Sequence, residues 1–181
     1  MLPGALTFLI ICTTTARNTK SGGPSAGLTR PAPAPACVVF SGFFGRLPNL
    51  KIVTHHMGGM VPSARGASVT DGISSARELS DSDYGQLLRT MKKRPVDYFK
   101  MFYADTARFG AAAGTRCGLE FFGLDQGVFA SDVAFEPSPG LYTRETIRCI
   151  EALGLNEVDK ERIYAGNARR LLRLEKSQGA A

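Results

Sequence analysis

The chain of 181 residues has only two histidines and four cysteines, and its first 36 residues contain no acidic side chain. The cysteines form no CxxC pair and lack zinc-finger spacing, which excludes a finger module and gives no disulfide framework. Long apolar runs are missing too: the run at residues 5–12 is far too short to span a bilayer. With 44% hydrophobic and 21% charged residues, the composition excludes wholesale disorder, a coiled coil and a collagen-like chain.

Basic residues outnumber acidic ones, and the excess is uneven along the chain. There are 22 Lys and Arg against 16 Asp and Glu, giving a net charge of +6. Arg17, Lys20 and Arg30 account for half of it, so the remainder of the chain is nearly neutral. Because its basic residues form no face interleaved with aromatic side chains, we expect no nucleic-acid partner.

Residues 1–36 differ from the rest and predict a disordered or atypical tail. The apolar run at 5–12 has the length of a signal-peptide core, but no Lys or Arg precedes it, so a secretory signal is the less favoured alternative. Residues 18–36 are rich in Gly, Pro, Ser and Ala, including an alternating Pro-Ala stretch typical of an extended linker. We expect one domain over 37–176 and a short tail over 177–181.

The body alternates strand and helix patterns. Short apolar runs predict buried strands at 50–54, 99–104 and 127–132. The apolar residues at 38–44 are compatible with either a helix or a strand. Apolar spacing and capping residues predict helices at 80–93, 108–122, 143–153 and 157–174. This order predicts an α/β fold with a parallel sheet and right-handed crossovers. Cys117 and Cys149 fall in helical patterns as reduced, buried thiols, which favours a cytoplasmic protein without a membrane partner.

Polar residues gather where the three predicted strands end. His55 and His56 follow the first, Asp105 the second and Asp132 the third. Because the carboxyl ends of parallel strands share one edge, these side chains are candidates for a common site. Adjacent histidines on an extended segment point to opposite sides of a sheet, so we expect one of them to serve the site. The glycines at 58–59 allow a ligand to approach the backbone closely.

Each of these residues also has a structural interpretation. The histidines are equally well a hydrogen-bonded structural pair. Asp132 is a cap for the following segment or a paired or metal-bound carboxylate, and Asp105 is a candidate for local hydrogen bonding to the backbone. Two strand-end ligands do not complete a catalytic zinc site, which uses about three protein groups and a water molecule.

Four segments, in order, resemble the carboxy-terminal half of the amidohydrolase-related family. They are residues 47–62 with the Thr-His-His-Met-Gly-Gly turn, 97–107 with Tyr-Ala-Asp-Thr-Ala, 128–132 with Phe-Ala-Ser-Asp, and 163–172. The most similar branch is that of aminocarboxymuconate-semialdehyde decarboxylase and the resorcylate-type decarboxylases. The resemblance implies a partial (β/α)8 TIM-like barrel, in a family that binds one divalent metal, usually zinc, at the strand ends.

The resemblance also implies roles for particular residues. His56 matches the family's catalytic histidine, a general acid and base that orients the metal-bound water. Asp132 matches the carboxylate at the last strand, which ligates the metal and shuttles a proton. His55 has no family role that carries over, which favours a structural one. Family members are commonly dimers, so a homodimer is expected.

The sequence departs from the family where other ligands are expected. The His-x-His or Glu-x-His pair of the family's first strand and a further histidine of a middle strand have no counterpart, and residues 63–75 differ from the family's aromatic and Arg-containing segment. The expected function is a metal-dependent carboxy-lyase acting on a small unsaturated or aromatic carboxylic acid. A metal-dependent hydrolase of the same superfamily and a truncated, non-enzymatic fragment are the alternatives, so the sequence leaves open whether this chain is itself an enzyme.

Overall fold

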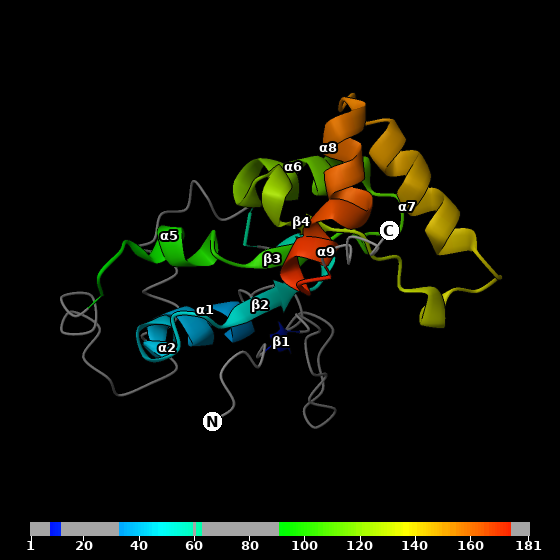
Figure 1. Ribbon diagram of the computed structural model, residues 1–181. Helices are drawn as coiled ribbons and strands as arrows, with labels where there is room; N and C mark the ends of the chain where they lie inside the picture. Colours follow the sequence, from blue (N-terminus) through cyan, green and yellow to red (C-terminus); the bar gives the residue numbers. More distant parts are fainter. Residues whose placement is uncertain (1–7, 12–32, 60, 63–90, 175–181) are drawn as a thin grey trace, which may run out of the picture.

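The computed structural model describes residues 8–11, 33–59, 61–62 and 91–174. Its sheet has four parallel strands in the order β1-β2-β3-β4 (Figure 1). These strands are β1 (Phe8–Ile11), β2 (Lys51–Thr54), β3 (Tyr103–Asp105) and β4 (Gly127–Val128). Helical segments connect them, as a parallel arrangement requires.

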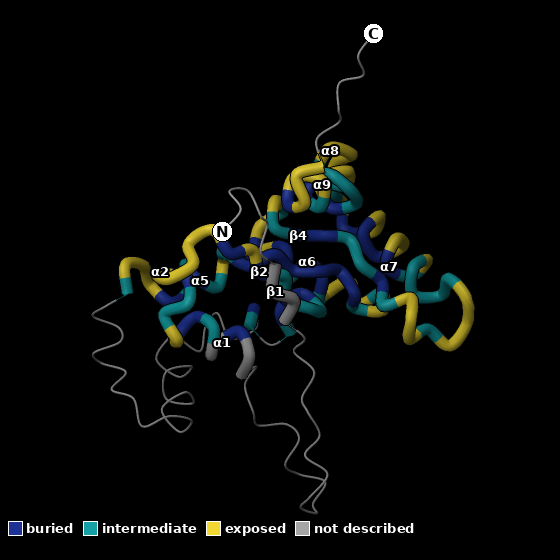
Figure 2. Tube along the Cα trace, turned by 60° about the horizontal axis from the view of Figure 1, so that its bottom comes forward, coloured by how far each residue is buried: buried dark blue, intermediate teal, exposed yellow. Residues whose placement is uncertain are grey.

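The helices fall into two groups, one beside β2 and one formed by the helices that follow β3 in the chain (Figures 1 and 2). The first group is α1 (Pro33–Phe40), α2 (Phe43–Arg46) and α5 (Pro95–Phe99). The second is α6 (Ala112–Phe122), α7 (Leu141–Glu151), α8 (Glu157–Glu161) and α9 (Asn167–Leu171). Shorter turns are η1 (His56–Gly58), η3 (Leu124–Gln126), η4 (Val133–Phe135) and the π-helical η5 (Arg162–Gly166).

The two faces of the sheet pack into different clusters. Ile52 and Ala104 belong to the main core, which α6 completes with Leu119 and Phe122. The residues beside them on β2 and β3 alternate to the other face, where a smaller cluster is made of Val53, Tyr103, Val128 and Leu171. One buried face under helices and a second, inner face are the layers of a (β/α)8 barrel, so the fold is the expected partial barrel.

The predicted tail over 1–36 differs from the structure at both of its described pieces. Residues 8–11 form β1, paired with β2 from Phe8 opposite Lys51 to Ile11 opposite Thr54. Pairing between segments distant in sequence leaves no local signal, and the short apolar run resembled a signal-peptide core instead. Residues 33–36 begin α1 rather than an extended linker, because proline suits the first helical turn, where amide groups lack partners. The prediction for residues 12–32 lies outside the described residues.

Strand lengths were overestimated in the sequence prediction. The strand predicted at 99–104 is β3, shorter and shifted, because Pro95 begins α5 instead of only ending a helix before it. The strand predicted at 127–132 contains only Gly127–Val128, and Asp132 has left the extended conformation with φ 59°. The helix predicted at 80–93 lies mostly outside the described residues, and its last residues, 91–93, are not helical.

The remaining helices lie close to their predicted ranges, and the stretch predicted at 157–174 divides into α8, η5 and α9. Helix α6 ends at its C-cap Gly123, and α8 begins at Asn156, whose side chain accepts the Asp159 backbone N–H. On α7, Ile150 is fully buried, whereas Ile147 is 40% exposed. Cys149 is a buried free thiol and Cys117 is half-buried. Among the described residues, the helices are all too short or too polar to cross a membrane.

Candidate active site at the strand ends

The register of the sheet brings His55 next to Asp105. Val53 lies opposite Tyr103 and Thr54 opposite Ala104, so the next position on each strand pairs His55 with Asp105 on the inner face. The His55 Nδ1 atom lies 2.5 Å from Asp105 Oδ2. An imidazole from one strand and a carboxylate from its neighbour are therefore joined by the regular pairing of the sheet.

The chain leaves β2 through a left-handed turn. His56 and Met57 have φ values of 53° and 52°, and Gly58 and Gly59 follow at 73° and 59°. A left-handed non-glycine residue is strained and persists where the surroundings enforce it, which is common at functional sites. A Cβ at Gly58 would come within 2.7 Å of the Phe122 ring, so this position requires glycine.

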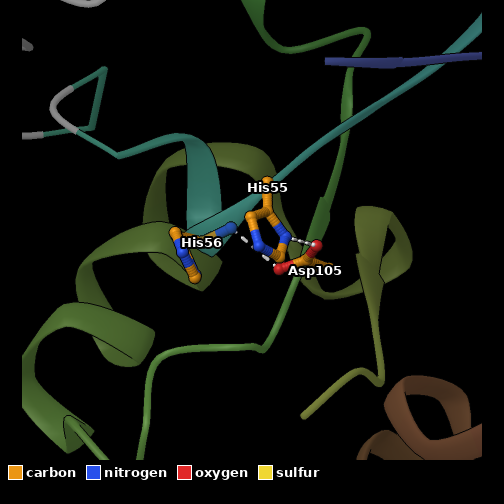
Figure 3. A group of neighbouring side chains, drawn as sticks. All are labelled: His55, His56 and Asp105. Carbon is orange, nitrogen blue, oxygen red and sulfur yellow. Dashed lines mark hydrogen bonds and ion pairs between the residues drawn. The ribbon is translucent and has the colours of Figure 1, made fainter. Parts of the chain in front are cut away.

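The turn changes the expected direction of the second histidine. In an extended strand the two rings would lie on opposite sides of the sheet, but the left-handed His56 returns its ring to the side of His55. The ring centroids are 3.7 Å apart. Both histidines therefore belong to one site (Figure 3).

Asp105 accepts hydrogen bonds from three donors. Its Oδ2 faces His55 Nδ1, and its Oδ1 accepts the backbone N–H of His56 at 2.8 Å (Figure 3). The same Oδ1 accepts the backbone N–H of Ala107 at 3.2 Å. The bond to Ala107 is the local contact that the sequence suggested for this aspartate, and the other two join β3 to the end of β2. Asp105 therefore holds both histidines.

Asp132 approaches the same histidines from the segment that follows β4. It follows β4 in a left-handed conformation that aspartate tolerates, and its Oδ1 lies 3.2 Å from His55 Nε2. Its Oδ2 lies 3.8 Å from His56 Nε2. Thr106 fixes the segment before Asp132, because its hydroxyl donates to the Ala130 carbonyl at 2.9 Å and accepts the Ala130 N–H at 3.0 Å.

The charge environment favours a protonated His55. Burial acts most strongly and disfavours the imidazolium, but the hydrogen bond and negative charge of Asp105, together with those of Asp132, outweigh it. The pKa of His55 is consequently raised above its ordinary value of 6.5. Two carboxylates around one imidazole attract positive charge, which either a proton or a metal ion supplies.

Aromatic and basic side chains border His56. Its Nδ1 donates to the Ala107 carbonyl, and its own carbonyl accepts a bond from the Arg108 guanidinium at 3.1 Å. The Phe109 ring lies 5.4 Å from the His56 ring, centroid to centroid, and 4.6 Å from that of Tyr142. Phe109 is 49% exposed although it is a large apolar side chain, so an apolar surface lies open beside the imidazole.

The donor set fits a divalent cation. Imidazole nitrogens and carboxylate oxygens suit zinc or manganese. His55, His56 and Asp105 offer ligand atoms within 4.8 Å of one another. Both oxygens of Asp105 already accept hydrogen bonds, however, whereas Asp132 turns its oxygens to the two imidazole Nε2 atoms. Asp132 is thus the better placed carboxylate for a cation, with Asp105 behind His55.

The structure brings together His56 and Asp132, the two candidate residues of the sequence, on one rim of the sheet. It also pairs His55 with Asp105, a contact that sequence reasoning missed because the strand register is not visible in the sequence. It also adds Thr106, which links the ends of β3 and β4. The sequence already placed the two histidines and two aspartates at strand ends, but that position does not show which of them are in contact.

Comparisons with known proteins identify the family. The sequence profile of the Amidohydrolase family matches residues 7–174. A search among curated proteins finds no match. Solved structures do match, among them the 5-carboxyvanillate decarboxylase of Sphingomonas paucimobilis, with 25% identity and a TM-score of 0.58 over 76% of this chain and 38% of that one.

Two further solved structures extend the comparison. The 4-oxalomesaconate hydratase of Rhodopseudomonas palustris is 28% identical, with a TM-score of 0.54 over 75% of this chain and 39% of its own. The dihydroxybenzoic acid decarboxylase of Polaromonas sp. JS666, solved with manganese and the inhibitor 2-nitroresorcinol, is 24% identical. Its TM-score is 0.59, and the match covers 80% of this chain and 40% of the decarboxylase. The chain thus spans about two fifths of the length of these proteins. With nearly all of its residues matched by the profile, the chain belongs to the Amidohydrolase family.

Proposed function

We propose that the chain carries active-site residues of a metal-dependent carboxy-lyase, which removes carbon dioxide from a small aromatic or unsaturated carboxylic acid. The observation that carries this proposal is the convergence of two imidazoles and two carboxylates at the ends of β2, β3 and β4. Relatives with the same fold supply the reaction class, since the decarboxylases of Sphingomonas and Polaromonas are among them.

A divalent cation at this site would be zinc, as the family resemblance implies, or manganese, as in the Polaromonas enzyme. When bound, such a cation supplies Lewis-acid polarisation of a substrate oxygen and lowers the pKa of a bound water molecule. Asp132 is the carboxylate that holds it, because its two oxygens face the imidazole nitrogens rather than backbone amides. Two carboxylates near the site also attract a cation.

His56 is the proposed proton donor and acceptor. Its Nδ1 is fixed by donation to the Ala107 carbonyl, so the Nε2 atom is the one that exchanges protons. The side chain is 28% exposed, which leaves it open to a substrate. In the proposed reaction, Nε2 delivers a proton to the carbon that bears the carboxylate. The carbon–carbon bond to that group then breaks, its electron pair returns to the substrate carbon, and carbon dioxide leaves.

The surface beside His56 suits a planar substrate. Phe109 presents an aromatic ring next to the imidazole and packs in turn against the ring of Tyr142, and aromatic rings pack against one another at such spacings. An aromatic acid lying against Phe109 would place its ring beside the proton donor. This favours an aromatic acid over a short aliphatic one.

The proposal is tested with the full chain loaded with zinc or manganese and assayed for carbon dioxide release from 2,6-dihydroxybenzoate and 5-carboxyvanillate. We expect release from at least one aromatic acid and its loss in His56→Gln, a variant of similar size that cannot exchange protons. The matched control is Lys51→Gln. Lys51 is exposed at the first position of β2, at the opposite end of the strand from the site. Absence of carbon dioxide release from every aromatic acid tested would contradict the proposal.

Hydration of an unsaturated acid is a second candidate, favoured by the 28% identity to the hydratase of Rhodopseudomonas palustris. It needs the same parts, a cation and a group that delivers a proton to carbon, but it adds water across a double bond instead of releasing carbon dioxide. Product analysis separates the two reactions and also the hydrolysis of an amide or lactone. A homodimer and a cytoplasmic location stay predictions.

A further inference from the structure

Both imidazoles of the site use Nδ1 as a hydrogen-bond donor. His55 Nδ1 faces Asp105 Oδ2 at 2.5 Å, and an ionised carboxylate only accepts hydrogen bonds. His56 Nδ1 faces the Ala107 carbonyl, which also only accepts. In the neutral form of each ring, the lone pair therefore lies on Nε2, the nitrogen through which a metal is bound.

Both Nε2 atoms face the same carboxylate. His55 Nε2 lies 3.2 Å from Asp132 Oδ1, and His56 Nε2 lies 3.8 Å from Asp132 Oδ2. A lone pair facing a carboxylate oxygen at the shorter distance is repulsive unless positive charge lies between them. Two donors that share one zinc ion, with bonds of about 2.0–2.2 Å, lie about 3.0–3.5 Å apart. The separation of His55 Nε2 and Asp132 Oδ1 falls in this range.

We infer that His55 is a direct ligand of the divalent cation through Nε2, together with Asp132, and that Asp105 is the positioning residue that orients His55. The inference deepens the proposed function, on which it rests for the presence of a cation. The family resemblance gives His55 no role, and the sequence favoured a structural one. Histidines that bind a metal commonly donate their other ring N–H to a carboxylate. The carboxylate fixes the orientation of the ring and raises the basicity of the nitrogen that binds the metal.

The geometry favours His55 over His56 as this ligand. His55 is closer to Asp132, and its Nδ1 partner is a carboxylate, whereas that of His56 is a backbone carbonyl. Asp105 is itself held in place by the backbone N–H groups of His56 and Ala107. His56 Nε2 then stays available for proton transfer, as the proposed reaction requires.

The first test is the affinity of the full chain for zinc and manganese, measured by titration calorimetry at neutral pH without substrate. We expect Asp105→Asn to weaken binding about 10–100-fold, as for other residues that orient metal ligands. His55→Gln should weaken it further and more than His56→Gln does, and Lys51→Gln, the control at an exposed position at the start of β2, should leave it unchanged. Equal losses in the two histidine variants, or no loss in His55→Gln, would overturn the inference.

The second test needs no variant at position 55 or 105 and covers the case in which those variants fail to fold. The chain has only two histidines, so the imidazole nitrogens of the ¹⁵N-labelled protein give two sets of NMR signals, assigned with His56→Gln. Zinc should move the Nε2 signal of His55 and preserve its Nδ1–H. A zinc-induced shift confined to His56, or no shift in either ring, would refute the assignment.

The two proposals fail in different ways. Binding is measured without turnover, so intact binding through His55 in a chain that releases no carbon dioxide contradicts the carboxy-lyase and leaves the ligand assignment standing. Carbon dioxide release in a chain whose His55→Gln variant binds metal normally contradicts the ligand assignment alone.

Discussion

The ends of β2 and β3 hold their polar side chains differently from the end of β4. His55 and Asp105 are neighbours in the sheet register, and Asp105 also accepts two backbone N–H groups. In the described part of the chain, the Asp132 carboxylate instead contacts the two imidazole rings and no backbone amide. Asp105 therefore ties the end of β2 to β3 through hydrogen bonds, whereas Asp132 presents its charge to the two imidazole rings.

Removing the Asp105 carboxylate should have the largest effect on stability. Asp105→Ala leaves the His55 Nδ1–H and two backbone N–H groups without their acceptor in a site that is largely buried. We expect the free energy of unfolding to fall by about 2–4 kcal/mol, measured by urea denaturation. Asp105→Asn keeps one acceptor oxygen and should lose less. A loss in Asp105→Ala no larger than in Asp132→Asn would contradict the comparison.

The turn that carries His56 should be the next most sensitive feature. Gly58 and Gly154 have the same φ of 73°, but a Cβ at Gly58 meets the Phe122 ring at 2.7 Å and one at Gly154 meets nothing within 4 Å. Gly154→Ala should cost about 1–2 kcal/mol of unfolding free energy from the left-handed backbone alone. Gly58→Ala should cost about 1 kcal/mol more from overpacking, so equal costs would show that the turn is not held by α6.

Neutralising Asp132 should have a small effect on stability and a large one on the site. Asp132→Asn keeps a side chain that tolerates φ 59° and removes the charge that faces His55 and His56. We expect the metal-free chain to lose about 1 kcal/mol or less, because partly exposed ion pairs contribute little. Urea denaturation without metal measures it, and a loss as large as that of Asp105→Ala would place Asp132 among the residues that hold the fold.

The smallest expected effect concerns how the unfolding free energy of the metal-free chain depends on pH. Because the pKa of His55 is raised in the folded state, its contribution to stability is fully present below pH 6.5 and is lost as the pH rises through the folded value. Urea denaturation across this range should show stability falling with pH, and Asp105→Asn should flatten the curve. An unchanged slope in that variant would mean that Asp105 does not stabilise the imidazolium.

The fold was predictable where the signal is local. Helix α6, with its end at Gly123, and the strand before His55 follow from apolar spacing and from glycine. The pairing of β1 with β2 was not predictable, because it joins segments that are distant in the sequence. A short apolar run does not indicate which other strand it pairs with. The start of α5 at Pro95 was not predictable either, since proline both ends helices and suits the first turn of one.

The site was predictable in its residues but not in its contacts. His56 and Asp132 follow from the family resemblance, and all four polar residues lie at predicted strand ends. The contact of His55 with Asp105 depends on the register that sets Val53 opposite Tyr103, which the sequence does not display. The two histidine rings lie side by side because His56 adopts a left-handed backbone conformation, which bulky residues rarely adopt. The sequence indicates such a conformation only at the glycines that follow.

The metal content of the full chain tests the central claim most directly, that the ends of β2, β3 and β4 form a divalent cation site. The chain and its Asp132→Asn variant are dialysed against zinc and then against metal-free buffer, and the retained metal is measured by atomic emission. The account predicts stoichiometric zinc in the chain and a clear loss in the variant. No retained zinc in the chain, or equal retention in both proteins, would contradict it.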